Sequence, residues 1–361
     1  MRVPSPASSP LDVEDMRGRV RKALEAFLDA QAPRLEAVAD EVATVADEVR
    51  AFVLDGGKRL RPAFCYWGWR GVGGPDAEEI VVAAASLELL HACALVHDDV
   101  MDASDTRRGR AAMHRRFAAL HDDGGWRGSA AQFGVGAAIV VGDLCLIWAD
   151  QLLATCGLPA PALLRGRGLY DEMRVELMAG QYLDLVEQAR GDSSVDRALR
   201  VARYKSAKYT VERPLHLGAV LAGGSAEALA AYSRFGLPLG EAFQLRDDVL
   251  GVFGDPSQTG KPAGDDLREG KRTVLVATAL ERASAAQRAV VERLLGDESL
   301  DADGVERLRE VIDTTGARAA AERLIEQRTD AALAALDAAP VDPAAREVLA
   351  ALARAATARS S

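Results

Sequence analysis

Apolar residues recur at helical spacing along most of the chain. Between residues 11 and 54 they return every three or four positions, which predicts two helices with an interruption near Pro33. A long apolar run from Ile80 predicts an almost wholly buried helix that carries carboxylates at its far end. β-Branched runs are few and Ala and Leu are abundant, so the pattern favours an all-α protein.

The later segments continue this pattern with short polar breaks. The pattern predicts helices over 63–70, 135–153, 162–188 and from 226 to about 250, followed by Ala-rich amphipathic helices from 275 to 358 that serve as scaffold, dimer or end-capping elements. Residues 135–149 are very apolar, but the run is too short to span a membrane and contains Asp143, which predicts a core helix. Helical patterning resumes directly after Pro214, so a kink is expected there.

The composition and the net charge of the chain limit the classes of function that are possible. The 361 residues carry a formal charge of −10, which argues against a general binder of nucleic acid or anionic membranes. The four cysteines lie in apolar segments without metal-ligand spacing and predict buried thiols in a reduced compartment. Residues 1–10 lack the basic start and apolar core of a signal peptide and predict a disordered lead-in. We therefore expect a cytoplasmic protein without a transmembrane segment.

Paired carboxylates close the helix that begins near Ile80. Asp98 and Asp102 are one helical turn apart and share a face, whereas Asp99 points elsewhere. Mg²⁺ takes one or two such carboxylates and completes its octahedron with water and phosphate oxygens. A solvated acidic helix end would show the same pattern, but Arg107 and Arg108 follow at once and suit a polyanionic ligand.

Two further clusters repeat this combination of charges. Gly56–Pro62 (GGKRLRP) is a basic turn at a helix start, which favours an anion, although basic turns are usually solvated surface. Asp247 and Asp248 close a second apolar helix, and the Gly- and Pro-rich segment after it carries Lys261 and Lys271, a composition expected of a loop that covers phosphate.

Five motifs in a fixed order carry a family resemblance. The segments GGKRLRP, HDDVMDASDTRRG, KSAKYT, FQLRDD and GKPAGDDLREGKRT extend from Gly56 to Thr273. Together they resemble the trans-isoprenyl diphosphate synthase (polyprenyl synthetase) family, and most of all the actinobacterial-type geranylgeranyl and farnesyl diphosphate synthases. The resemblance implies a single isoprenoid-synthase helical-bundle domain over 11–361 around a central cavity, and a homodimer. It also implies Mg²⁺-dependent condensation of isopentenyl diphosphate with dimethylallyl, geranyl or farnesyl diphosphate.

The resemblance also implies residue roles. Mg²⁺ would be held by Asp98 and Asp102, with Asp99 in support, and a further Mg²⁺ by Asp247. Isopentenyl diphosphate would contact Lys58, Arg61, His91 and Arg108. The allylic diphosphate would contact Arg107, Lys205, Gln244, Lys261 and Lys271, with the hydroxyls of Ser206 and Thr210 near the cavity. Of these residues, Asp98, Asp102, Arg107, Lys205, Asp247 and Lys261 are the predicted catalytic set.

One position departs from the family pattern. Gly251 stands where the full second motif has its last aspartate, and Asp265 and Asp266 are the candidates to compensate, although an acidic pair in a loop is more often surface. The chemistry needs no protein nucleophile or strong base, because the isopentenyl double bond attacks an allylic cation and the released diphosphate accepts the proton. Metal, Lys and Arg stabilise the leaving diphosphate.

Product length is predicted from the helix before Asp98. One helical turn, about 5.4 Å, is close to one isoprene unit, so Ala94, Leu90 and Leu87 measure depth on the Asp98 side. The family resemblance adds Cys93 to the same floor. Cys93 and Ala94 are small where fifteen-carbon synthases usually carry an aromatic residue, which favours geranylgeranyl diphosphate. Farnesyl diphosphate would follow if a facing helix, around Leu146 or Met178, supplied the floor, and a longer product would follow if none did.

The sequence leaves three alternatives open. A class I terpene cyclase ionises an allylic diphosphate with a similar acidic motif but needs no second basic pocket such as GGKRLRP. A non-catalytic partner subunit would be expected to lack carboxylates of the first motif, and both Asp98 and Asp102 are present. A plain helical scaffold would require five ordered motifs by chance.

Overall fold

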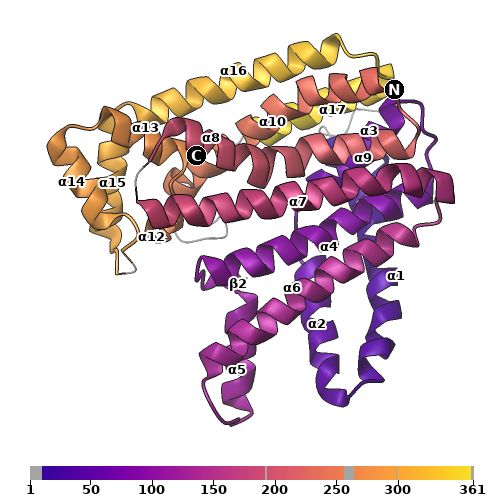
Figure 1. The fold of residues 1–361 in the computed structure, drawn as a ribbon, viewed down its shortest axis with the longest axis horizontal. Coiled ribbons are helices and arrows are strands. Elements are labelled where there is room, and N and C mark those ends of the chain that lie inside the picture. The colour runs from indigo at the N-terminus through magenta and orange to yellow at the C-terminus, as the bar shows by residue number, and fades with distance from the viewer. Residues whose placement is uncertain (1–9, 192, 256–263, 298, 359–361) are drawn as a thin grey trace, which may run out of the picture. The chain divides into compact units, whose positions relative to one another are not determined.

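The computed structural model describes residues 10–191, 193–255, 264–297 and 299–358. Helices dominate the described chain, which confirms the all-α prediction; the described strands are the two-residue partners of one hairpin. The described residues group into two compact units, one formed by the chain up to 166 with 217–224 and the other by 167–216 with the chain from 225 onward (Figure 1). The first acidic motif lies in the first unit, and the second acidic motif lies in the second unit.

The first unit is organised around the apolar helix that the sequence predicts. Its elements are η1 (Pro10–Asp15), α1 (Met16–Glu36), α2 (Asp40–Leu54), α3 (Leu60–Gly71), α4 (Glu78–Met101), β1 (Thr106–Arg107), β2 (Arg110–Ala111), α5 (Met113–Asp123) and α6 (Ala130–Ala154), with the start of α7 (Ala160–Arg190) and the end of α9 (Arg213–Leu221). Helix α4 is buried nearly all round, and α6 lies along it (Figure 1). The imidazole of His97 on α4 fills the space that a side chain at Gly142 of α6 would occupy. The end of α4 is thereby fixed against α6.

Helix α6 is not the core helix that its apolar composition predicts. Both α4 and α6 are long and apolar enough to cross a membrane by length and composition alone, yet 72% of the most apolar window of α4 is buried and only 28% of that of α6. The face of α6 that includes Ala138, Cys145 and Trp148 is buried in the first unit. Large apolar side chains on its other face remain exposed, because both faces of this helix are apolar and the described chain covers one.

The second unit surrounds the helix of the second acidic motif. Its elements are the rest of α7, α8 (Val195–Val201), the π-helix η2 (Ala202–Glu212), the start of α9, α10 (Ala226–Phe253), α12 (Asp265–Arg268), α13 (Val274–Arg282), α14 (Ala285–Leu294), α15 (Ala302–Thr314), α16 (Ala317–Asp337) and α17 (Pro343–Thr357). Helix α10 packs against α16 and η2, and its later turns join an apolar core with α13 and α15 (Figure 1).

The chain stays helical at the two prolines where an interruption and a kink are predicted. Helix α1 continues past Pro33 to Glu36, since a proline near a helix end costs only the bond to one earlier carbonyl. At Pro214 the helix continues, as predicted, and a widened π-helix ends directly before α9. Pro214 cannot donate to the carbonyl four residues earlier, and a π-helix pairs carbonyls with donors one residue further along.

Candidate functional site

The first acidic motif divides its carboxylates between two directions. Asp102 caps the end of α4, and its backbone N–H donates to the carbonyl of Asp98 at 2.8 Å, which confirms that the two aspartates are one turn apart. The side chain of Asp99 is 0% exposed and accepts a hydrogen bond from Nε of Arg107 at 2.8 Å, with a second, closer contact from Nη2. Nη2 of Arg107 also lies 3.6 Å from Oδ2 of Asp98. Asp99 therefore pairs with Arg107 and fixes the position of its guanidinium.

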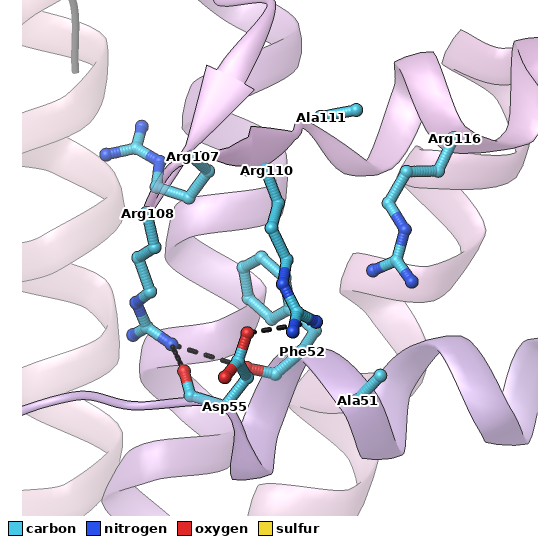
Figure 2. Close-up of a pocket in the computed structure, with 8 residues that line it drawn as sticks. All are labelled: Ala51, Phe52, Asp55, Arg107, Arg108, Arg110, Ala111 and Arg116. Carbon is cyan, nitrogen blue, oxygen red and sulfur yellow. Dashed lines mark hydrogen bonds and ion pairs between the residues drawn. The ribbon is translucent and has the colours of Figure 1, made fainter. Parts of the chain in front are cut away.

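A tight hairpin turns Arg107 and Arg108 in different directions. Arg108 and Gly109 both have positive φ, 54° and 74°, which is the geometry of a type I′ turn between β1 and β2. Figure 2 shows Arg108 directed toward the end of α2, where its Nη1 donates to the carbonyls of Phe52 at 3.3 Å and Asp55 at 3.0 Å. Arg107 points away from that end. The Asp55 carboxylate pairs with Arg110 at 3.0 Å.

The basic turn joins the same group of charges. Gly56 and Gly57 have φ of 75° and 91°, so the backbone there follows a path that suits glycine. Lys58 is exposed and Arg61 half-buried at the start of α3. Burial lowers the pKa of His91 on α4 well below its usual value, and the charges of Arg61 and Arg108 lower it further. His91 is therefore neutral near pH 7 and stands among the arginines predicted to bind diphosphate.

The second acidic motif contains a buried aspartate that the sequence did not single out. Burial raises the pKa of Asp248 to about 8, and a hydrogen bond from Gln244 Nε2 to Asp248 Oδ1, at 2.7 Å, acts against that rise. Asp266 and Asp247 raise the pKa further, which shows that three carboxylates lie near one another. Gln244 donates this hydrogen bond within the protein, and its contact with the allylic diphosphate stays a prediction.

The carboxylate of Asp266 occupies the space beside Gly251. A Cβ added at Gly251 would overlap the carboxylate of Asp266, so a third aspartate of the second motif has no room while Asp266 lies there. Asp266 lies in the first turn of α12, and the Leu267 side chain beside it is buried. Nζ of Lys271 lies 2.7 Å from Oε2 of Glu269 and 3.9 Å from Oδ1 of Asp266. Of the loop residues, Lys261 lies outside the described chain, as does most of the predicted covering loop at 260–264.

Close backbone packing positions Lys205. A Cβ at Gly180 of α7 would overlap the backbone of Lys205, and one at Gly240 of α10 would overlap that of Ala207, so two glycines let η2 lie directly against both helices. Nζ of Lys205 pairs with Oδ2 of Asp184 at 2.6 Å. Ser206 is half-buried, and Thr210 one turn further on is buried.

The four predicted chain-length residues divide between two faces of α4. Ala94 is half-buried, as Asp98 is, whereas Leu87 and Leu90 are fully buried. Cys93 is also fully buried, with Sγ 3.8 Å from Nδ1 of His97. Asp143 of α6 adds to the burial that raises the pKa of Cys93 to about 12, so this thiol faces α6.

The carboxylates of the first unit suit a hard divalent cation. No group of three or more His, Cys, Asp or Glu side chains assembled for a metal occurs within the described part of the chain. Asp98 and Asp102 offer two carboxylates from successive turns, and Mg²⁺ commonly takes one or two carboxylates and completes its shell with water and substrate phosphate. The donor set therefore fits Mg²⁺ bound together with a diphosphate.

Comparisons with known proteins agree with this chemistry. A model of the polyprenyl synthetase family matches residues 42–312. A geranylgeranyl diphosphate synthase of Mycobacterium tuberculosis is 34% identical over 78% of this chain and 75% of its own length, and a (2E,6E)-farnesyl diphosphate synthase of Mycobacterium bovis is 32% identical over 76% and 73%. A crystal structure of a Corynebacterium glutamicum geranylgeranyl pyrophosphate synthase, complexed with isoprenyl diphosphate and magnesium, is 43% identical, has a TM-score of 0.93, and matches over 96% of this chain and 99% of its own. This likeness confirms the predicted helical-bundle fold.

Proposed function

The chain belongs to the polyprenyl synthetase family and is a trans-prenyltransferase, and from this premise we propose that it makes geranylgeranyl diphosphate from isopentenyl diphosphate and an allylic diphosphate. The observation that carries the proposal is the position of Arg107 beside Asp98 of the Asp98–Asp102 pair at one end of α4, with Arg108 next to it in the hairpin turn. Carboxylates for a cation and guanidiniums for an anion are both present within a few residues, as binding of a metal diphosphate requires.

Asp98 and Asp102 hold Mg²⁺ in this proposal, and Arg107 and Lys205 bind the allylic diphosphate. Bound Mg²⁺ supplies charge stabilisation for the departing diphosphate. Asp99 orients Arg107 and does not itself need to bind metal, because its Oδ1 is already engaged by the guanidinium. The C–O bond of the allylic substrate breaks, the isopentenyl double bond attacks the resulting cation, and the released diphosphate takes the proton.

Lys58, Arg61, His91 and Arg108 form the isopentenyl diphosphate pocket. A neutral His91 donates one N–H without adding to the repulsion among the arginines. The contacts of Arg108 and Arg110 at the end of α2 keep the hairpin close to the basic turn. A second dedicated basic pocket is the feature that a class I terpene cyclase does not need.

The second unit supplies a further metal-binding group in this proposal. Asp247 is its first carboxylate, and Asp266 replaces the aspartate missing at Gly251, since its carboxylate fills the space beside that glycine. Lys261, Gln244 and Lys271 remain proposed contacts of the allylic diphosphate, with Ser206 nearby. Lys271 and Lys205 each pair with a carboxylate in the structure, Lys271 with Glu269 and Lys205 with Asp184.

The proposed product has twenty carbons. Ala94 is small and half-buried one turn before Asp98, so a growing tail can pass it, while the fully buried Leu90 and Leu87 slow extension at the next turns. Farnesyl and longer diphosphates are the alternative products. The single domain expected over 11–361 remains part of this proposal.

A homodimer is the proposed assembly. Ile139, Val140 and Ile147 are exposed apolar side chains on α6, which a second copy of the same helix would cover. The four cysteines are free and buried, in keeping with the proposed cytoplasmic location.

Incubation with isopentenyl diphosphate, Mg²⁺ and each allylic diphosphate in turn tests the function. A synthase consumes both substrates and yields a longer prenyl diphosphate. Consumption of the allylic substrate alone would indicate a cyclase, and consumption of neither would indicate a partner subunit or scaffold. Chromatography of the dephosphorylated products measures chain length, with geranylgeraniol as the expected main peak.

A further inference from the structure

A buried ion pair lies directly beneath the basic turn. Arg59 donates through Nη1 to Oε2 of Glu88 on α4, and the two side chains are only 7% and 3% exposed. Nη2 of the same guanidinium donates to the carbonyl of Val53, in the last turn of α2, at 2.7 Å. One side chain therefore ties the end of α2 and the middle of α4 to the start of α3.

Arg59 faces inward while its neighbours face outward. Lys58 is exposed and Arg61 half-buried, and Arg59 between them has a left-handed φ of 55° at the position that precedes α3. A non-glycine residue adopts this conformation only at a cost in free energy, which surrounding contacts must offset. The contacts of the guanidinium with Glu88 and Val53 offset it here.

Glu88 is also a counter-charge for Arg108. A Cβ added at Gly57 would lie 3.5 Å from Nη1 of Arg59 and 3.6 Å from Nη2 of Arg108, so both guanidiniums lie next to the same point beside the bare glycine backbone. Burial lowers the pKa of Arg108, Glu88 acts most strongly against this, and Arg59 and Arg107 lower it further. Without Glu88, Arg59 and Arg108 would be like charges held close together with little water.

We propose that Glu88 and Arg59 are positioning residues for isopentenyl diphosphate, which hold the basic turn and Arg108 in the arrangement that receives this substrate. The inference rests on the proposed isopentenyl pocket and extends it to two residues that contact no substrate. A buried ion pair adds little net stability compared with apolar packing, but removing one partner leaves an uncompensated charge. Loss of the carboxylate should therefore displace Arg59 and disturb its neighbours.

The test compares Glu88→Gln with Glu88→Asp and Arg59→Lys. In Glu88→Gln the KM for isopentenyl diphosphate should rise about tenfold or more, with the KM for the allylic substrate changed less than about twofold. Glu88→Asp keeps the charge and should restore most of the affinity. Arg59→Lys keeps its charge but cannot reach both Glu88 and Val53 with a planar fork, so it should resemble Glu88→Gln.

A matched control separates positioning from stability. Glu241 is another buried carboxylate, 2% exposed, that pairs with Arg203 and Arg328 in the second unit. Glu241→Gln should lower the melting temperature to a similar extent without raising the KM for isopentenyl diphosphate. If Glu88→Gln does not fold well enough for kinetics, calorimetric titration of folded Glu88→Asp and Arg59→Lys with isopentenyl diphosphate still measures the pocket.

The outcomes separate this inference from the proposed function. Equal rises in both Michaelis constants, or an unchanged KM for isopentenyl diphosphate in a folded Glu88→Gln variant, would overturn the positioning role. An unmodified chain that consumes no isopentenyl diphosphate would instead overturn the proposed function. A selective loss in Glu88→Gln that Glu88→Asp repairs would support the inference.

Discussion

Replacing Ala94 by phenylalanine tests where the prenyl tail runs. Ala94 lies four residues before Asp98, a rise of about 6 Å, and Leu90 lies about 12 Å before it. If the tail descends along this stripe, an aromatic ring at Ala94 blocks it one turn below the metal-binding aspartates. Because one turn is about 5.4 Å and close to one isoprene unit, at least one unit should be lost. The product should shift from twenty carbons to fifteen or fewer, with condensation retained.

Cys93 provides the matched control, since it is adjacent in sequence but faces α6. It is fully buried next to His97, so Cys93→Phe should overpack the contact between α4 and α6 and destabilise the fold by about 1–3 kcal/mol. Ala94 is half-buried and should accept the ring with a smaller loss of stability. Thermal melts and chromatography of dephosphorylated products measure the two effects.

An unchanged twenty-carbon product from Ala94→Phe would show that the tail does not pass Ala94. A shortened product from Cys93→Phe, with Ala94→Phe unchanged, would move the floor to the side of α4 that faces α6. Either result would refute the assignment of depth to the Asp98 stripe.

Four further outcomes follow from the site. Asp98→Ala should lower turnover by several orders of magnitude with little change in melting temperature, and near-normal rates at limiting Mg²⁺ would contradict its role as a metal ligand. Lys58→Ala should raise the KM for isopentenyl diphosphate more than that for the allylic substrate and Lys205→Ala should do the reverse, whereas equal effects would refute this division. Asp266→Asn should weaken binding of Mn²⁺, measured by electron paramagnetic resonance with inorganic diphosphate present. Unaltered Mn²⁺ binding would show that Asp266 does not replace the aspartate missing at Gly251. Burial lowers the pKa of His216, so below about pH 6.5 the unfolded state binds more protons than the folded state, and the free energy of unfolding falls as the pH drops through this window. His216→Gln should therefore flatten the fall in melting temperature with pH. An identical pH profile of the melting temperature in the variant would contradict this.

The sequence predicted the elements whose patterning is local. The spacing of apolar residues identified α4 and α10, and the geometry of an ideal helix was enough to place Asp98 and Asp102 on one face. The relation between these two aspartates follows from the 3.6-residue period, which holds for a helix in any tertiary setting.

Other features depended on contacts between distant segments. Arg59 looks like one more solvated charge in GGKRLRP, and only the position of Glu88, 29 residues later, identifies it as buried. Asp266 could be named as a candidate from its charge, but its overlap with the space beside Gly251 is a tertiary fact. The exposed face of α6 was missed because apolar composition does not reveal whether a single chain covers both faces of a helix.

In the proposed function one helix, α4, serves both cation and anion binding, and its periodicity explains how. Neighbouring residues on a helix point about 100° apart, so the carboxylates of Asp98 and Asp99 leave the helix in different directions. Glu88 and Asp99 are eleven residues apart, which returns them to within about 20° of the same direction, and each buried carboxylate holds a guanidinium, that of Arg59 and that of Arg107 respectively. In the proposed function, Glu88 and Asp99 on this face hold arginines, whereas Asp98, which also lies 3.6 Å from Arg107, and Asp102 bind the metal. If this division is correct, Asp99→Asn should weaken diphosphate binding through Arg107 while leaving Mn²⁺ binding nearly intact, and Asp98→Asn should weaken Mn²⁺ binding directly. A variant of Asp99 that loses Mn²⁺ as fully as one of Asp98 would show that the two aspartates act together on the metal.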